Sequence, residues 1–386
     1  MRIGIITGEY PPMQGGVGAY TRILAQHYAQ LGHDVFLYAD HRAREANPHI
    51  HLTAPVKRWN IKTLLHIRAW ASQHQLDVVN LQFETAAYQM SGWIHFLPLF
   101  LPNVPLVTTF HDLLTPYLFP KAGALRGKIV NYLAHRSSGV IVTNHEDYDK
   151  QSHLKQIALI PIGSNIPDTL PAEYDRPTWR KKAGANEDEF LIAYFGFLNQ
   201  SKGVDRLLKD TADLLQAGYK LKLVLIGDRV GTSDSANIHY AQTIDKLIAD
   251  LQLMPFITWT GFIDEAEVSA YLQSADAVAL PFTDGASYRR GTLMAAIQHN
   301  RPIITTAPKV AIPQFVDQEN MLFATSDHDG NLTIAPCIQA LYQQPALASS
   351  LQAGTQSLAQ YFQWDSITAQ TLDFFQQVID MRGKIS

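Results

Sequence analysis

The first forty residues, MRIGIITGEYPPMQGGVGAYTRILAQHYAQLGHDVFLYAD (residues 1–40), decide the fold class. Residues 2–7 are an apolar run that predicts a buried strand, and residues 17–31 place apolar side chains at helical spacing. A second apolar run follows at 35–39. Because parallel strands need a crossover between them, usually a helix, the stretch predicts a parallel α/β sheet.

The same alternation continues along the chain and is interrupted once. Residues 162–176 are rich in Pro, Gly and polar side chains, which is typical of a linker. We therefore expect two Rossmann-like, doubly wound domains, 1–165 and 166–365, with a C-terminal helix at 366–386 that packs back on the first. Further strands are predicted at 77–81, 105–110, 139–143, 190–195, 222–226, 256–259, 277–280 and 302–305. Further helices are predicted at 61–73, 125–135, 204–217, 241–251, 264–274 and 291–299. Ligands of such sheets bind beyond the carboxyl ends of the strands, so two facing domains predict a cleft between them.

Composition narrows the class of protein. The chain has 386 residues, of which 46% are hydrophobic and 17% charged, as expected for a globular protein with more than one core. The single cysteine excludes an internal disulfide framework and suits a reducing compartment. The N-terminus resembles a strand rather than a signal peptide, so we expect a cytoplasmic protein. A net charge of −4 without a nucleic-acid-binding motif predicts no nucleic acid partner.

Charge is distributed unevenly. Residues 1–165 carry 14 Lys/Arg and 10 Asp/Glu, whereas residues 166–386 carry 17 and 25. Two stretches of the first half, 46–76 and 113–145, contain no acidic residue, and aromatic side chains are interleaved with their basic ones. Peripheral contact with an anionic membrane is one interpretation, and a solvated basic face is the other. The basic residues are Lys57, Arg58, Lys62, Arg68, Lys121, Arg126, Lys128 and Arg136.

The glycine cluster predicts a close approach to the backbone. Gly15, Gly16 and Gly18 follow the first strand and open a helix, whose N-terminus carries a partial positive charge. A phosphate or diphosphate fits such a place. A tight turn without a ligand remains the alternative.

Six motifs in order resemble those of family 4 glycosyltransferases, which are retaining nucleotide-sugar enzymes with the GT-B fold of two facing Rossmann-like domains. The resemblance covers nearly the whole chain. The motifs are EYPPMQGGVGAYTRILAQHYAQLGHDV (9–35), TTFHDL (108–113), LIPIGSNI (159–166), IAYFGFLNQSKGVDRLL (192–208), LVLIGD (223–228) and YLQSADAVALPFTDGAS (271–287).

Three positions depart from the family pattern. Phe197 stands where the family commonly has an arginine, Asp284 replaces the first of two glutamates, and Thr292 stands where the second is expected. The sequence DGASYRRGTLMAAIQHNRP (284–302) brings two arginines instead. We hypothesise that Arg289 or Arg290 supplies the positive charge missing at position 197.

The resemblance and the chemistry of sugar transfer together predict roles for site residues. Lys202, with Arg289 or Arg290, is expected to stabilise charge on the leaving diphosphate. Asp284 is expected to accept hydrogen bonds from the sugar, with helix capping as the alternative, and the resemblance implies that His111 contacts the donor sugar. The backbone around Gly15, Gly16, Gly18, Gly196, Gly203, Gly227, Asp228, Gly285 and Ser287 is expected to bind the donor. The acceptor side is predicted to hold Glu9, Tyr10 and Asp112.

These observations predict a retaining, metal-independent hexosyltransferase of glycan biosynthesis. It would move a sugar from a nucleotide sugar to a sugar, a lipid-linked or a small-molecule acceptor, and it needs no cofactor. A catalytically silent binding or regulatory protein and a nucleotide-sugar epimerase on the same fold remain alternatives.

Overall fold

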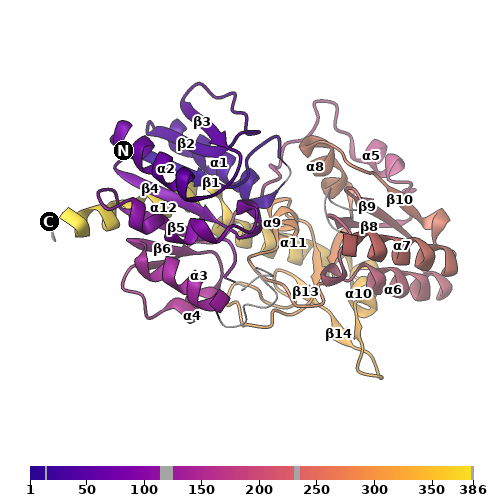
Figure 1. Ribbon diagram of the computed structural model, residues 1–386. Helices are drawn as coiled ribbons and strands as arrows, with labels where there is room; N and C mark the ends of the chain where they lie inside the picture. Colours follow the sequence, from indigo (N-terminus) through magenta and orange to yellow (C-terminus); the bar gives the residue numbers. More distant parts are fainter. Residues whose placement is uncertain (14, 114–124, 230–234, 384–386) are drawn as a thin grey trace. The chain divides into compact units, whose positions relative to one another are not determined.

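The computed structural model describes residues 1–13, 15–113, 125–229 and 235–383, except for the side chains of 125, 126 and 235–237 (Figure 1). The chain divides into two compact units. The first consists of Met1–Asn165 and Gln363–Ser386, and the second of Ile166–Phe362.

The first unit is built on a seven-stranded sheet in the order β3-β2-β1-β4-β5-β6-β7. All its strand pairs are parallel. A parallel sheet is covered on both faces, which is why β1 and β4 consist almost entirely of buried residues. The strands are β1 (Arg2–Thr7), β2 (Asp34–Asp40), β3 (Ile50–Val56), β4 (Val78–Phe83), β5 (Leu106–Phe110), β6 (Gly139–Val142) and β7 (Ile157–Leu159).

Two hydrophobic cores lie on opposite faces of this sheet. One contains apolar residues of α1 (Gly16–Gln30) and of the C-terminal helix α12 (Trp364–Gly383). The other contains residues of α2 (Ile61–Gln73), of the 3-10 segment η2 (Gly92–Phe100) and of α3 (Leu125–Arg136). The helix α12 belongs to the first unit because Phe374 and Val378 pack where Gly139 has no side chain. The remaining elements are η1 (Ala86–Tyr88) and α4 (His145–Gln151).

The second unit contains a six-stranded parallel sheet in the order β10-β9-β8-β11-β12-β13 and a short antiparallel pair, β14-β15. Its strands are β8 (Phe190–Phe195), β9 (Leu221–Ile226), β10 (Ile257–Trp259), β11 (Ala277–Leu280), β12 (Ile303–Thr305), β13 (Leu322–Phe323), β14 (Thr325–Ser326) and β15 (Leu332–Thr333). Its helices are α5 (Arg176–Lys182), η3 (Gln200–Lys202), α6 (Val204–Gln216), α7 (Ser235–Asp250), η4 (Met254–Phe256), α8 (Glu265–Ser274), α9 (Gly291–Gln298), α10 (Ala335–Gln343), α11 (Pro345–Ala359) and η5 (Gln360–Phe362).

The predicted fold class of two parallel-sheet, Rossmann-like domains is confirmed, and several elements absent from the prediction are short. The strands β7 and β13 have three and two residues, too few to show a periodic pattern. The helix α10, which was not predicted, carries a proline in its first turn, a position where proline is tolerated.

Candidate active site

In the second unit, a set of tight turns lies at the carboxyl edge of the sheet. Gly196 directly follows β8, Gly227 directly follows β9, and Gly203 precedes α6. Gly203 has a φ of +65°, and a Cβ there would lie 2.0 Å from the carbonyl oxygen of Pro281. Only glycine fits both the left-handed conformation and this close approach. The turn therefore fixes η3 and Lys202 against the end of β11.

The ammonium of Lys202 lies over the turn that follows β8. A Cβ on Gly196 would be 2.4 Å from Lys202 Nζ and 2.9 Å from Cγ2 of Thr292, so Gly196 makes room for both. Burial, and then the nearby charge of Arg290, lower the pKa of Lys202 to about 8. Within the described part of the chain, no carboxylate forms an ion pair with this ammonium.

Arg290 directly precedes α9, and its side chain reaches the same place. Its guanidinium stacks over the ring of Phe282 at 4.7 Å, and its Nη1 donates to the hydroxyl of Ser201 at 3.3 Å. Its Nη2 donates to a carboxylate oxygen of Asp284 in an ion pair. The ammonium of Lys202 and the guanidinium of Arg290 thus lie at the same end of the sheet. Of these two cations, only Arg290 forms an ion pair with a carboxylate among the described residues, that of Asp284.

The other residues predicted for this edge differ in their burial and in their partners. The charge that helps to lower the pKa of Lys202 is that of Arg290. Arg289, the preceding residue, is partly buried. Asp284 accepts from Arg290, and its side chain is 47% exposed. Gly285 packs against the carbonyl oxygen of Ala307. The carbonyl of Ser287 accepts from the amide of Arg290 at 3.1 Å, and the exposed Asp228 accepts from the amide of Arg229 at 2.7 Å.

In the first unit, Glu9 occupies the N-terminus of α1. Its Oε1 accepts from the amides of Val17 at 3.1 Å and Gly18 at 3.2 Å. A Cβ on Gly15 would lie 2.2 Å from this carboxylate, whereas one on Gly16 would meet nothing within 4 Å. The group that approaches the glycine cluster in the structure is therefore a carboxylate of the chain itself. A phosphate at this place stays a prediction. Burial, and more weakly the nearby Glu84, raise the pKa of Glu9.

The structure does not support Tyr10 as an acceptor-binding residue. Its side chain is fully buried in the core beneath α1, and its hydroxyl donates to a carboxylate oxygen of Glu45. A buried tyrosine needs such a partner, and Glu45 could not be identified as that partner from local sequence. Asp112 is partly exposed, two residues beyond the end of β5.

His111 directly follows β5 and is partly exposed. Its Nε2 lies 2.8 Å from Oε1 of Gln82, and the ring of Tyr20 meets it edge-on at 4.8 Å. Burial lowers the pKa of His111 to about 4. Sequence analysis missed Gln82 and its neighbour Asn80. The available signal was two polar residues inside the otherwise apolar strand VVNLQF.

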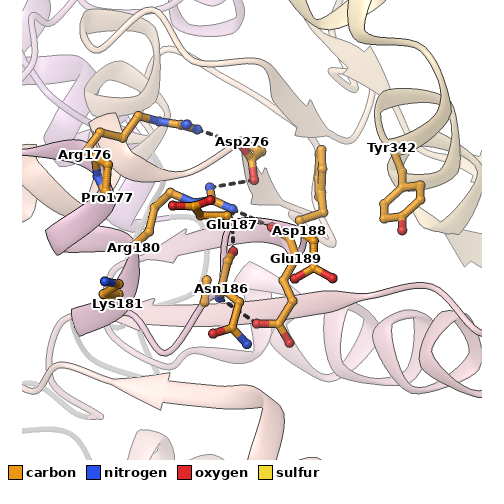
Figure 2. A pocket seen from close by; sticks show the side chains of 12 residues that line it. Arg176, Pro177, Arg180, Lys181, Asn186, Glu187, Asp188, Glu189, Asp276 and Tyr342 are labelled. Atoms are coloured by element: carbon orange, nitrogen blue, oxygen red, sulfur yellow. Dashed lines mark hydrogen bonds and ion pairs between the residues drawn. The ribbon is translucent and has the colours of Figure 1, made fainter.

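A pocket of about 620 Å³ lies at the opposite edge of the second sheet, between α5 and the start of β8. Figure 2 shows Arg176 and Arg180 directed toward Asp276 from α5. Arg180 also donates to the carbonyl oxygens of Ser274, Asn186 and Glu189. Because these backbone groups and Asp276 use its donors, we assign this cluster to stability rather than to ligand binding.

The described residues contain neither a membrane-spanning helix nor a metal-binding cluster. None of their helices is long and apolar enough to cross a membrane. No group of three or more His, Cys, Asp or Glu side chains among them is arranged to hold a metal ion.

Two Rossmann-like units with parallel sheets are the architecture of the GT-B class of glycosyltransferases. Residues 14–163 match Glycosyltransferase Family 4, and residues 175–329 match Glycosyl transferases group 1. The chain therefore belongs to family 4 of the glycosyltransferases, enzymes that move a sugar from a donor to an acceptor, and the resemblance found in the sequence is confirmed.

Similar proteins fall into two sets. The chain is 24% identical to an alpha-monoglucosyldiacylglycerol synthase of Streptococcus pneumoniae, over 72% of this chain and 65% of that enzyme. It is 23% identical to the enzyme of the same name from Acholeplasma laidlawii, over 85% of this chain and 86% of that enzyme. Among solved structures it resembles HepE of Anabaena in complex with UDP, at a TM-score of 0.75 and 18% identity over 98% of this chain and 100% of that one. Sucrose-phosphate synthase of Thermosynechococcus elongatus has a TM-score of 0.74 at 21% identity, over 98% and 99%.

Proposed function

We propose that the protein is a retaining, metal-independent glycosyltransferase that moves a hexose from a UDP-sugar to a lipid-linked acceptor. The observation that carries this proposal is the ammonium of Lys202, which lies beside Arg290 and has no ion-pairing carboxylate among the described residues. Two cations brought together in a half-buried place repel one another. A diphosphate bound between them would relieve this repulsion.

The chemistry follows from the charge that the leaving group acquires. The bond between the anomeric carbon and the diphosphate oxygen breaks, and a bond to the acceptor oxygen forms on the same face of the sugar. The acceptor proton passes to the leaving diphosphate, so no side chain is required as a general base. Lys202 and Arg290 would stabilise the negative charge that grows on the diphosphate, and fixed donors of this kind accelerate group transfer strongly.

The donor and acceptor are proposed from the similar proteins. The HepE structures contain UDP or UDP-glucose, and the synthases from Streptococcus and Acholeplasma are named for a glucosyldiacylglycerol product. We therefore take UDP-glucose and diacylglycerol lipids as the first substrates to test, with small sugars as the second acceptor class.

The release of UDP tests this function directly. The protein is incubated with UDP-glucose, with and without diacylglycerol in detergent, and with EDTA in one series. We expect lipid-dependent release of UDP that EDTA leaves unchanged, and an α-linked product from the α-linked donor by NMR. Lys202→Met and Arg290→Gln should each lower kcat by about 100- to 1000-fold, as typical for losing one donor to a developing anion. Arg289→Gln is the matched control. A wild-type protein that releases no UDP from any nucleotide sugar contradicts the proposal.

A surface of the first unit supports contact with an anionic membrane. The helix α2 packs against η2. Large apolar side chains project into solvent from both elements; they are Ile61, Leu65, Trp93 and Leu99. On or just before α2, basic side chains are exposed and no carboxylate among the described residues pairs with them; they are Lys57, Arg58, Lys62 and Arg68. We propose that this α2–η2 surface rests on the inner face of a membrane.

Vesicle flotation tests the α2–η2 surface. We expect binding to vesicles that contain phosphatidylglycerol, weaker binding at high salt, and loss of binding in the double variant Trp93→Ser, Leu99→Ser. Leu31→Ser is the matched control, because Leu31 is 61% exposed at the end of α1, away from this surface in the sequence. Equal flotation of the double variant and the wild type contradicts the proposed contact.

A further inference from the structure

A chain of hydrogen-bonded side chains leads along one face of the sheet of the first unit to His111. Asn80 and Gln82 are two residues apart on β4, so they project from the same face of the sheet. Both have no exposed surface. Because a buried polar group without a partner costs about 1–3 kcal/mol, every donor and acceptor in this chain has to be matched.

The direction of these hydrogen bonds is fixed from one end. Asn80 Nδ2 donates to the carbonyl oxygen of Val107 at 3.1 Å and to the hydroxyl of Thr109 at 2.9 Å. A carbonyl oxygen only accepts, so the amide nitrogen of Asn80 must face Val107 and its oxygen must face Gln82. Gln82 therefore donates to Asn80 through Nε2. Its remaining atom, Oε1, is the acceptor that faces Nε2 of His111 at 2.8 Å.

This direction decides where His111 carries its proton. Because its pKa is lowered to about 4, the ring is neutral at neutral pH and has one proton. Gln82 Oε1 can only accept, so that proton lies on Nε2 and Nδ1 presents a lone pair. No hydrogen bond to Nδ1 comes from the described residues. The Tyr20 ring packs against the imidazole in a T-shaped arrangement and limits its rotation.

We propose that Gln82, oriented by Asn80, is a positioning residue that holds the His111 proton on Nε2, so that Nδ1 accepts a hydrogen bond from a sugar hydroxyl. The inference rests on the proposed function for the nature of the ligand. His111 follows β5 at the carboxyl edge of the sheet, where α/β sheets bind ligands. A lone pair attracts a hydroxyl and repels a phosphate oxygen. The arrangement thus selects the sugar part of the donor over its diphosphate.

The position of the proton can be observed without substrate. Protein labelled with ¹⁵N-histidine is examined by long-range ¹H–¹⁵N NMR, with the signals of His111 assigned from their loss in His111→Asn. We expect only the Nε2–H tautomer in the wild type. Gln82→Met removes the acceptor at similar volume and should shift the ring signals toward an average of both tautomers. Thr109→Val is the matched control, because it removes a hydroxyl that Asn80 contacts but leaves the path from Val107 to His111 intact.

Kinetics with UDP-glucose test the effect on the ligand. Gln82→Met should lower kcat/KM for UDP release by about fivefold, the effect of one neutral hydrogen bond. It should leave the affinity for UDP unchanged, because UDP lacks the hexose whose hydroxyl His111 would contact. His111→Asn, whose amide oxygen can replace Nδ1, should retain more activity than His111→Phe.

Several results would overturn the inference. They are a proton on Nδ1 in the wild type, an unchanged tautomer in Gln82→Met, or equal loss of UDP and UDP-glucose affinity in that variant. Absence of turnover with every nucleotide sugar would instead count against the proposed function, because the NMR spectrum reports the proton independently of substrate.

Discussion

The affinity for UDP should fall as pH rises from 7 to 9, and Lys202 is the group responsible. In the free protein its pKa is lowered from 10.5 to about 8, by burial first and Arg290 second. A bound diphosphate would favour the charged ammonium and raise this pKa again. Binding then takes up a proton, and the stabilisation is fully present below the pKa of the free protein. It is lost as pH rises above that value.

The size of the effect follows from the same values. One pKa unit corresponds to about 1.36 kcal/mol. Lowering the pKa of Lys202 from 10.5 to about 8 therefore means that keeping this ammonium charged costs the free protein about 3 kcal/mol. If UDP restores the ordinary pKa of Lys202, about nine-tenths of the free protein must take up a proton on binding at pH 9, and the dissociation constant rises about tenfold relative to pH 7.

Isothermal titration calorimetry with UDP, in two buffers of different ionisation enthalpy, measures both the affinity and the protons taken up. Lys202→Met is measured alongside, because the ionisation of UDP itself affects both proteins equally. We expect weaker binding by Lys202→Met at pH 7 and convergence of the two affinities toward pH 9. Parallel curves for the two proteins would show that the charge of Lys202 does not meet the diphosphate.

Three further substitutions have defined outcomes. Gly203→Ala should destabilise the second unit by more than the roughly 1–2 kcal/mol that a left-handed conformation costs alanine, because the added Cβ also meets Pro281. Thermal melting measures this loss. Gly218→Ala is the control, because Gly218 has a φ of +90° but open space around it. Glu9→Gln should raise the melting temperature at pH 7 and leave it unchanged at pH 4. The reason is that the pKa of Glu9 is higher in the folded than in the unfolded protein. Its contribution to folding stability is therefore kept below the pKa of the unfolded protein and lost as the carboxyl ionises in the folded one. Asp284→Asn should strengthen UDP binding by no more than about fivefold, because the ion pair with Arg290 is partly exposed; unchanged UDP affinity with weaker UDP-glucose binding would instead assign Asp284 to the sugar.

The fold could be predicted from sequence because the buried strands repeat a strong local pattern. Strands that are apolar on both faces, such as FLIAYF in β8, are typical of parallel sheets, and the regular helices between them have clear starts. For example, α2 was predicted at its observed bounds, and Asn60 caps it by accepting from the amides of Lys62 and Thr63. The three-residue strand β7 was missed because it is defined by pairing with β6, which lies earlier in the chain, and not by a pattern in its own residues.

The candidate site was predicted less completely, because its contacts join residues far apart in the chain. Lys202 could be found from its motif, but the approach of Arg290 depends on where α9 begins relative to η3. Tyr10 was placed on the acceptor side because it follows the first strand. Its burial against Glu45, 35 residues away, could not be inferred from that position.

The glycine cluster shows the same limit in a different form. Missing side chains indicated that some group approaches the backbone, and the helix N-terminus led us to predict a phosphate or diphosphate there. The structure fills that place with the carboxylate of Glu9. A diphosphate that used the same amides would have to displace Glu9, and the burial that raises the pKa of this carboxyl lowers the cost of moving it into water. Glycine at position 15 is therefore required by the free protein itself, whether or not a donor reaches α1.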